Sequence, residues 1–194
     1  MHYLTRQRLH LSRFHPLMKG LLTLYVISVA LATCVAALKY SDRAEWSPRG
    51  AGVYVRGATQ DGGAATLDAF GDPLAGTPEG SALRPALTRR QLVDIVHPHL
   101  FTIPIILFIL GHLLHLTRLP DALKLGVNAT AFLAFFATFL APLVVEDRAV
   151  LGPLLFVSGT ALLASLGAQC LVTLWELWLG EPGEGFDALP RQGP

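Results

Sequence analysis

The chain has 194 residues, of which 52% are hydrophobic and 15% are charged, and its formal net charge is +1 at pH 7. Soluble domains carry about 25% charged residues, so this composition argues against an ordinary soluble enzyme and predicts an integral membrane protein. The sequence also lacks the pattern of aromatic and basic residues that is typical of nucleic-acid-binding proteins, which argues against a nucleic-acid partner. No nucleotide-binding glycine loop or nucleophile motif occurs in the sequence.

Four runs with few or no charges predict four membrane-spanning helices, since about 20 apolar residues cross the hydrocarbon of a bilayer. We therefore expect an all-α integral membrane protein whose four helices form an antiparallel bundle. The spans are predicted at residues 20–39, 98–118, 119–145 and 149–180. The flanking segments are a basic arm (1–19), an extramembrane loop of about 50 residues (40–87), a short interfacial helix (88–97) and a tail (181–194).

The orientation is predicted from the basic residues that precede the first span. Arg6, Arg8, Arg13 and Lys19 stand there without an acidic residue, and an excess of basic residues favours the cytoplasmic side. Four crossings then return the C-terminus to that side, and we expect the inner membrane of a bacterium. A cleaved signal peptide is the alternative for the first apolar run, although an uncleaved anchor is expected.

The loop is rich in Gly, Pro, Asp and Ala, and its only strand-like piece is Gly52–Arg56. It is either ordered by its neighbours or a flexible connector. Next, Thr88 and Gln91 fit a capping box at the start of the interfacial helix. Pro98 is a favourable first residue for the membrane helix that follows.

Histidine is concentrated at and just before the second span, where residues 97–115 hold four of the seven histidines of the chain. At about 100° per residue, His97 and His115 share a helix face, His112 lies about 60° from both, and His99 points the other way. About 27 Å of helix separates His97 from His115. Ionisable side chains within a membrane normally mark a functional site, so the pattern predicts one ligand site near each membrane surface.

Haem is the cofactor that this pattern favours, because neutral imidazole ligates haem iron well. Membrane b-type cytochromes offer a chemical analogy, with histidines thirteen to fourteen residues apart on one helix, and His99 and His112 are thirteen apart. A second axial ligand must come from a homodimer, another subunit, His15 or a donor other than histidine. Alternatively, the histidines meet water and lipid headgroups, or His112 and His115 bind zinc or copper.

Other polar residues in the spans are expected to join helices by hydrogen bonds. They are Asn128, Thr130 and Thr138 in the third span and Gln169 and Thr173 in the fourth. Glu176 lies between Trp175 and Trp178. We expect it to be a carboxylate at the membrane surface, with a proton site linked to quinone as the alternative.

These features predict an electron-transfer subunit of a larger redox or photosynthetic complex. It would bind haem b through His97, His99, His112 and His115, with quinone as a further cofactor. Its expected partners are membrane lipid and other membrane or periplasmic subunits, or a second copy. The alternative is a scaffold subunit without a cofactor, which binds partner proteins and lipids or pigments. Either role is more in keeping with the sequence than a stand-alone enzyme.

Overall fold

A computed structural model of the chain describes residues 10–57 and 86–180. Every regular element in these two ranges is a helix. In chain order they are the 3-10 turn η1 (Leu11–Arg13), α1 (Pro16–Ala44), α2 (Pro48–Arg56), α3 (Arg89–His115), α4 (Asp121–Val144) and α5 (Arg148–Leu179). Of these, α1, α3, α4 and α5 are long and apolar enough to cross a membrane. The predicted all-helical membrane protein with four spans is thereby confirmed.

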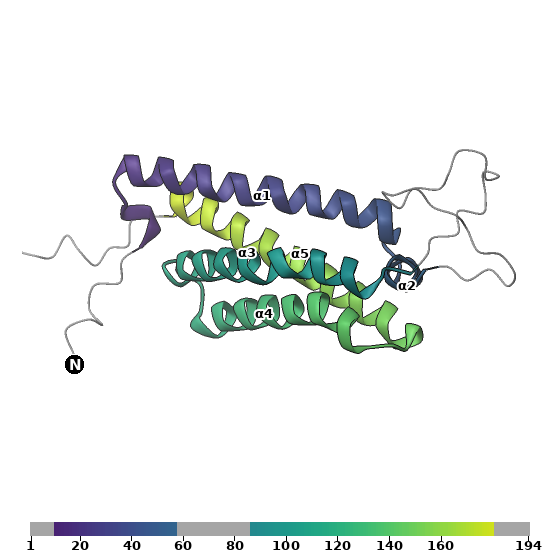
Figure 1. The fold of residues 1–194 in the computed structure, drawn as a ribbon. Helices are drawn as coiled ribbons and strands as arrows, with labels where there is room; N and C mark the ends of the chain where they lie inside the picture. Colours follow the sequence, from purple (N-terminus) through teal and green to yellow (C-terminus); the bar gives the residue numbers. More distant parts are fainter. Residues whose placement is uncertain (1–9, 58–85, 181–194) are drawn as a thin grey trace, which may run out of the picture.

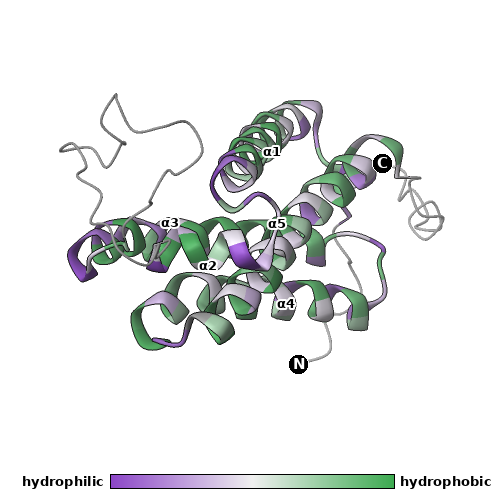
Figure 2. Ribbon diagram, turned by 90° about the vertical axis from the view of Figure 1, so that its right-hand side faces the viewer, coloured by the Kyte–Doolittle hydropathy of each residue, from purple (hydrophilic) through white to green (hydrophobic). Residues whose placement is uncertain are grey.

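Helix α5 is the centre of the bundle. It contacts every other helix and η1, and a larger share of its apolar stretch is buried than in any other span. Figures 1 and 2 show it between α1 on one side and the α3–α4 pair on the other. The short link between α3 and α4 makes these two helices antiparallel neighbours.

The helices meet through small and polar side chains, as expected where lipid supplies no hydrophobic driving force between helices. Ser158, Ser165 and Gln169 of α5 are buried. The Thr138 hydroxyl donates to Ser158 Oγ at 2.9 Å, and Gln169 Nε2 donates to Asn128 Oδ1 at 3.4 Å. These two bonds confirm the expected polar links between α4 and α5. Thr130, which was grouped with them, is instead exposed.

Gly111 allows α3 to approach α4 closely, and this makes it a sensitive position. A Cβ atom there would lie 3.0 Å from Asn128 Oδ1, whereas a Cβ atom at Gly126 would meet no atom within 4 Å. Gly111→Leu is therefore expected to lower the free energy of unfolding by about 1–3 kcal/mol. Gly126→Leu, on the exposed side of α4, is the matched control. Thermal unfolding in detergent tests this, and equal melting temperatures of the two variants would contradict it.

Residues 52–56, expected as a strand-like piece of the loop, belong to helix α2. Ser47 Oγ accepts from Gly50 N at 2.9 Å as the N-cap, and Pro48 occupies the first turn, which is a favourable place for proline. Ala51, Gly52 and Val55 are buried, and α2 packs against α5. The beginning of the loop is thus ordered by its neighbours, while residues 58–85 lie outside the described part.

A second correction concerns the interfacial helix at 88–97 and the span at 98–118. The capping box of Thr88 and Gln91 is present, but α3 continues from it to His115 without interruption and contains Pro98 and Pro104. Leu92 and Val96 are buried on the bundle side, so the first turns continue the packing face of the membrane helix. Membrane helices tolerate internal proline where neighbouring groups satisfy the freed backbone.

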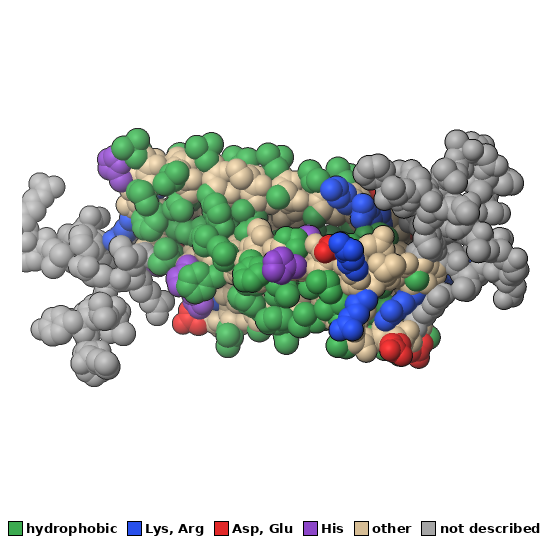
Figure 3. Space-filling model, in the orientation of Figure 1, with side chains coloured by type: hydrophobic (Ala, Val, Ile, Leu, Met, Phe, Trp, Pro, Cys, Tyr) green, Lys and Arg blue, Asp and Glu red, His purple; other side chains and the backbone are tan. Residues whose placement is uncertain are grey.

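The surface agrees with a bundle that spans a membrane. Figure 3 shows hydrophobic side chains along most of its length, with Lys and Arg gathered near one end. We call this end, which holds α2, the C-terminus of α1 and the N-terminus of α3, the α2 end. The opposite end, which holds η1, the N-terminus of α1 and the C-terminus of α3, is the η1 end.

Candidate functional site: the histidines of helix α3

Helix α3 turns three of its four histidines away from the bundle. His97, His112 and His115 are exposed, whereas His99 is half-buried. This division follows from the helix period, because His99 lies about 200° around the axis from His97. The exposures agree with the faces that the sequence predicted for the four rings.

Two exposed phenylalanines accompany the outward histidines. Phe101 and Phe108 have 64% and 61% of their surface exposed. Phe101 meets the His97 ring edge to face at 5.4 Å between centroids, and Phe108 lies 4.2 Å from the His112 ring. Together with His115, these residues form one aromatic face, which we call the α3 outer strip. Its flat rings and exposed position suit contact with a planar macrocycle.

The hydrogen bonds of the rings set which nitrogen is free. His112 Nδ1 lies 2.8 Å from the Phe108 carbonyl oxygen, and His99 Nδ1 lies 2.6 Å from that of Ile95. A carbonyl oxygen only accepts, so each Nδ1 carries the proton and each neutral ring keeps its lone pair on Nε2. Histidines that ligate metals commonly make this kind of bond, which orients the ring and fixes its tautomer.

His99 lies between α3 and α4. Its ring stacks on Phe139 with centroids 4.8 Å apart and planes inclined by 20°. His99 and His112, the pair with the spacing of thirteen, therefore point toward different surroundings. The histidines that share the α3 outer strip are His97, His112 and His115, and about 22 Å of helix separates His97 from His112.

The histidines of α3 are not part of a ready-made metal site in the described residues. Within residues 10–57 and 86–180, no three His, Cys, Asp or Glu side chains come together as a metal site. His15, one of the expected sources, caps the start of α1, where its Nδ1 accepts from Leu17 N at 3.4 Å. The alternative of a zinc or copper site at His112 and His115 thus lacks a third ligand in this part of the chain.

Glu176 lies in the last turn of α5, and its side chain faces the interior of the bundle. It is buried, and its carboxylate Oε1 lies 3.4 Å from Arg118 Nε. Trp175 and Trp178 are exposed, since consecutive helix positions point about 100° apart. Glu176 thus faces the opposite way from the two tryptophans, while all three lie near the C-terminal end of α5.

Glu176 also continues a polar face of α5 that the sequence analysis did not connect. Gln169, Thr173 and Glu176 lie four and three residues apart. The Glu176 carboxylate is paired with Arg118, whereas Gln169 Oε1 and Thr173 Oγ1 are buried without a hydrogen-bond partner in the described protein. Buried oxygens of this kind normally bind ordered water. A period of four and three residues between polar side chains is the sequence feature from which this face could have been predicted.

Comparison with known families supports the membrane assignment. A family model for a transmembrane helical domain, Aq_1264_TM, matches residues 70–184. This chain belongs to that family. The matched range contains α3, α4, α5 and all four histidines discussed above, and it excludes α1 and α2. No curated protein and no solved structure matches the chain.

Proposed function

We propose that this protein is an electron-transfer subunit of a membrane complex and binds b-type haem on the α3 outer strip. The observation that carries the proposal is that His97 and His112 are exposed on one side of α3 and lie about 22 Å apart along it. A titratable ring facing lipid is costly unless it has a partner. Haem iron at each level would supply that partner, and two such levels would give electrons a route across the bilayer.

The local chemistry supports ligation by Nε2 of these rings. His112 has its Nδ1 bound to the Phe108 carbonyl, so its Nε2 is the free donor. Phe101 and Phe108 would flank the macrocycle with apolar surface. At the level nearer the α2 end, exposure favours His97 over His99, because the His99 ring is stacked on Phe139. At the other level, His112 has an oriented ring, and His115 is the alternative ligand.

Haem iron takes two axial ligands in such sites, and a second copy of the chain is a source of the missing one. Two copies with the same membrane orientation are related by a two-fold axis along the membrane normal, and such an interface pairs each surface with itself. His97 would then face His97 of the second copy, and His112 would face His112. A histidine from a different subunit is the other source.

We further propose that the η1 end faces the cytoplasm of a bacterial inner membrane. The described residues before and at the start of α1 include Arg13 and Lys19, and this segment contains no acidic residue. Basic residues also lie near the α2 end, but the first span usually dominates the choice of orientation.

An absorption spectrum of the full chain, purified after haem supplementation, tests the function. We expect a Soret band and α bands that shift on reduction with dithionite. His97→Ala and His112→Ala should each remove one component, whereas His99→Ala, two residues from His97, should retain both. A colourless preparation, or bands that survive the loss of all four α3 histidines, would refute haem binding and favour the scaffold role.

A further inference from the structure

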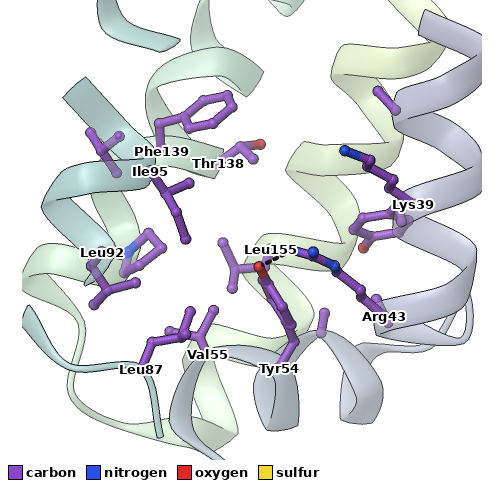
Figure 4. Close-up of a pocket in the computed structure, with 16 residues that line it drawn as sticks. Lys39, Arg43, Tyr54, Val55, Leu87, Leu92, Ile95, Thr138, Phe139 and Leu155 are labelled. Atoms are coloured by element: carbon purple, nitrogen blue, oxygen red, sulfur yellow. Dashed lines mark hydrogen bonds between the residues drawn. The ribbon is translucent and has the colours of Figure 1, made fainter. Parts of the chain in front are cut away.

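A cavity of about 220 Å³ lies at the α2 end, among α1, α2, α3, α4 and α5 (Figure 4). Its interior is mostly hydrocarbon, with Val55, Leu92 and Leu155 among the lining side chains. Figure 4 shows Lys39 and Arg43 on one side of the cavity, opposite Leu92 and the segment before α3. The cavity is thus apolar within and cationic along one wall.

The polar groups of the lining are suited to an anion. Lys39 and Arg43 lie one turn apart on α1, and the lining residues include no Asp or Glu. Arg43 Nη1 donates to Tyr54 Oη at 2.6 Å, and its guanidinium carbon lies 5.3 Å from the centre of the Tyr54 ring. This arrangement holds one cation in place at the wall. The Tyr40 hydroxyl, from the same turn of α1, is buried without a hydrogen-bond partner in the described protein.

Together these features select the class of ligand. A hydrocarbon chain fits an apolar cavity, and lysine and arginine are the side chains that recognise phosphate. A free phosphate would leave the apolar interior unfilled, and a neutral quinone would offer no negative charge to the Lys39 ammonium. A ligand that joins a phosphate to an acyl chain matches both parts of the cavity.

We propose that this cavity binds one anionic phospholipid, with its phosphate against Lys39 and Arg43 and an acyl chain among Val55, Leu92 and Leu155. The bound lipid fills the space between α1 and α3, two helices that are joined chiefly through α5. Phe139, which stacks on His99, also lines the cavity. The lipid site nevertheless requires no haem, so a test of the lipid site does not depend on the proposed function.

Quenching of Trp46 by brominated lipid tests the proposal in the full chain. Trp46 is partly exposed and lies against the cavity residue Tyr40, with ring centroids 5.1 Å apart. Trp175→Phe and Trp178→Phe leave it as the single tryptophan of the chain. Two cations contribute about 1 kcal/mol each toward an anionic lipid. We therefore expect brominated phosphatidylglycerol to bind about tenfold or more tightly than brominated phosphatidylcholine.

Matched variants separate the cavity from general surface charge. Lys39→Gln, alone and with Arg43→Gln, should reduce the preference for phosphatidylglycerol, and the single variant leaves the Arg43–Tyr54 contact intact. Arg89→Gln with Arg90→Gln removes the same charge from exposed positions at the same end, outside the cavity lining, and should retain it. Ala36→Phe narrows the cavity from an exposed lining position and should weaken the quenching by both lipids.

Several results would overturn the proposal. One is equal quenching by the two lipids in the otherwise unmodified single-tryptophan chain. Another is a loss of preference that is equally large in the control carrying Arg89→Gln and Arg90→Gln. Relief of quenching by inorganic phosphate alone, with Ala36→Phe unaffected, would indicate a simple anion site. Relief by a short-chain quinone that persists in the Lys39→Gln, Arg43→Gln variant would assign the cavity to quinone.

Discussion

Replacing Gly152 with alanine is expected to separate α2 from α5 and to destabilise the protein more than any other change considered above. A Cβ atom at Gly152 would collide with the Pro48 carbonyl oxygen and would also contact the Gly52 Cα atom at 3.4 Å. These are backbone atoms of α2, which cannot move aside as the end of a side chain can. We expect the free energy of unfolding to fall by about 3 kcal/mol, the upper end of the usual range for overpacking.

Gly167→Ala on the same helix is the matched control, because a Cβ atom there would meet nothing within 4 Å. Helix propensity alone favours alanine over glycine by about 1 kcal/mol at both positions. If Gly152→Ala lowers the stability while Gly167→Ala raises it, the difference is due to the contact with α2. Thermal unfolding in detergent gives the stability change, and amide hydrogen exchange over residues 48–56 reports the release of α2. If both variants melt and exchange alike, the close packing of α2 on α5 is refuted.

Loss of the Arg118 guanidinium is expected to cost more stability than loss of the Glu176 charge. The side chain of Glu176 is 10% exposed and that of Arg118 is 36% exposed. Arg118→Gln leaves a buried carboxylate without its cation, whereas Glu176→Gln leaves an arginine that water can reach. For Arg118→Gln we expect a loss of about 1–3 kcal/mol, the usual cost of a buried polar group without its partner, and for Glu176→Gln a smaller loss.

The double variant Arg118→Gln, Glu176→Gln completes this experiment. Removing both charges should recover part of the stability lost in Arg118→Gln, because a neutral amide then takes the place of the buried carboxylate. Chemical denaturation monitored by tryptophan fluorescence measures the three variants against the parent chain. Additive losses, or a larger loss for Glu176→Gln than for Arg118→Gln, would show that the pair is not coupled as its geometry indicates.

The number and type of membrane helices could be predicted from the sequence because each span must satisfy its own backbone and remain apolar over its length. The predicted residues 119–145 and 149–180 agree closely with α4 and α5. The prediction failed where a short segment depends on its packing partner. Residues 52–56 have a pattern that fits a strand, but the buried face of α2 and its contact with α5 favour a helix.

The candidate site was predictable to the extent that it follows from the helix period. The opposite facing of His97 and His99 needs only about 100° per residue, and their exposures agree with it. The spacing of thirteen between His99 and His112 gave no indication that His99 stacks on Phe139. That contact depends on the approach of α4. Haem ligation by these residues stays a prediction until a spectrum tests it.

The amino-acid sequence by itself determined that this protein is helical and crosses a membrane, since apolar length and low charge act locally along the chain. It also determined which histidines share a face of α3. Only the tertiary structure decided that α5 is central, that Glu176 is buried beside Arg118, and that five helices line a cavity with Lys39 and Arg43 on its wall. These features join residues that are far apart in the chain, and so they depend on how the helices pack together.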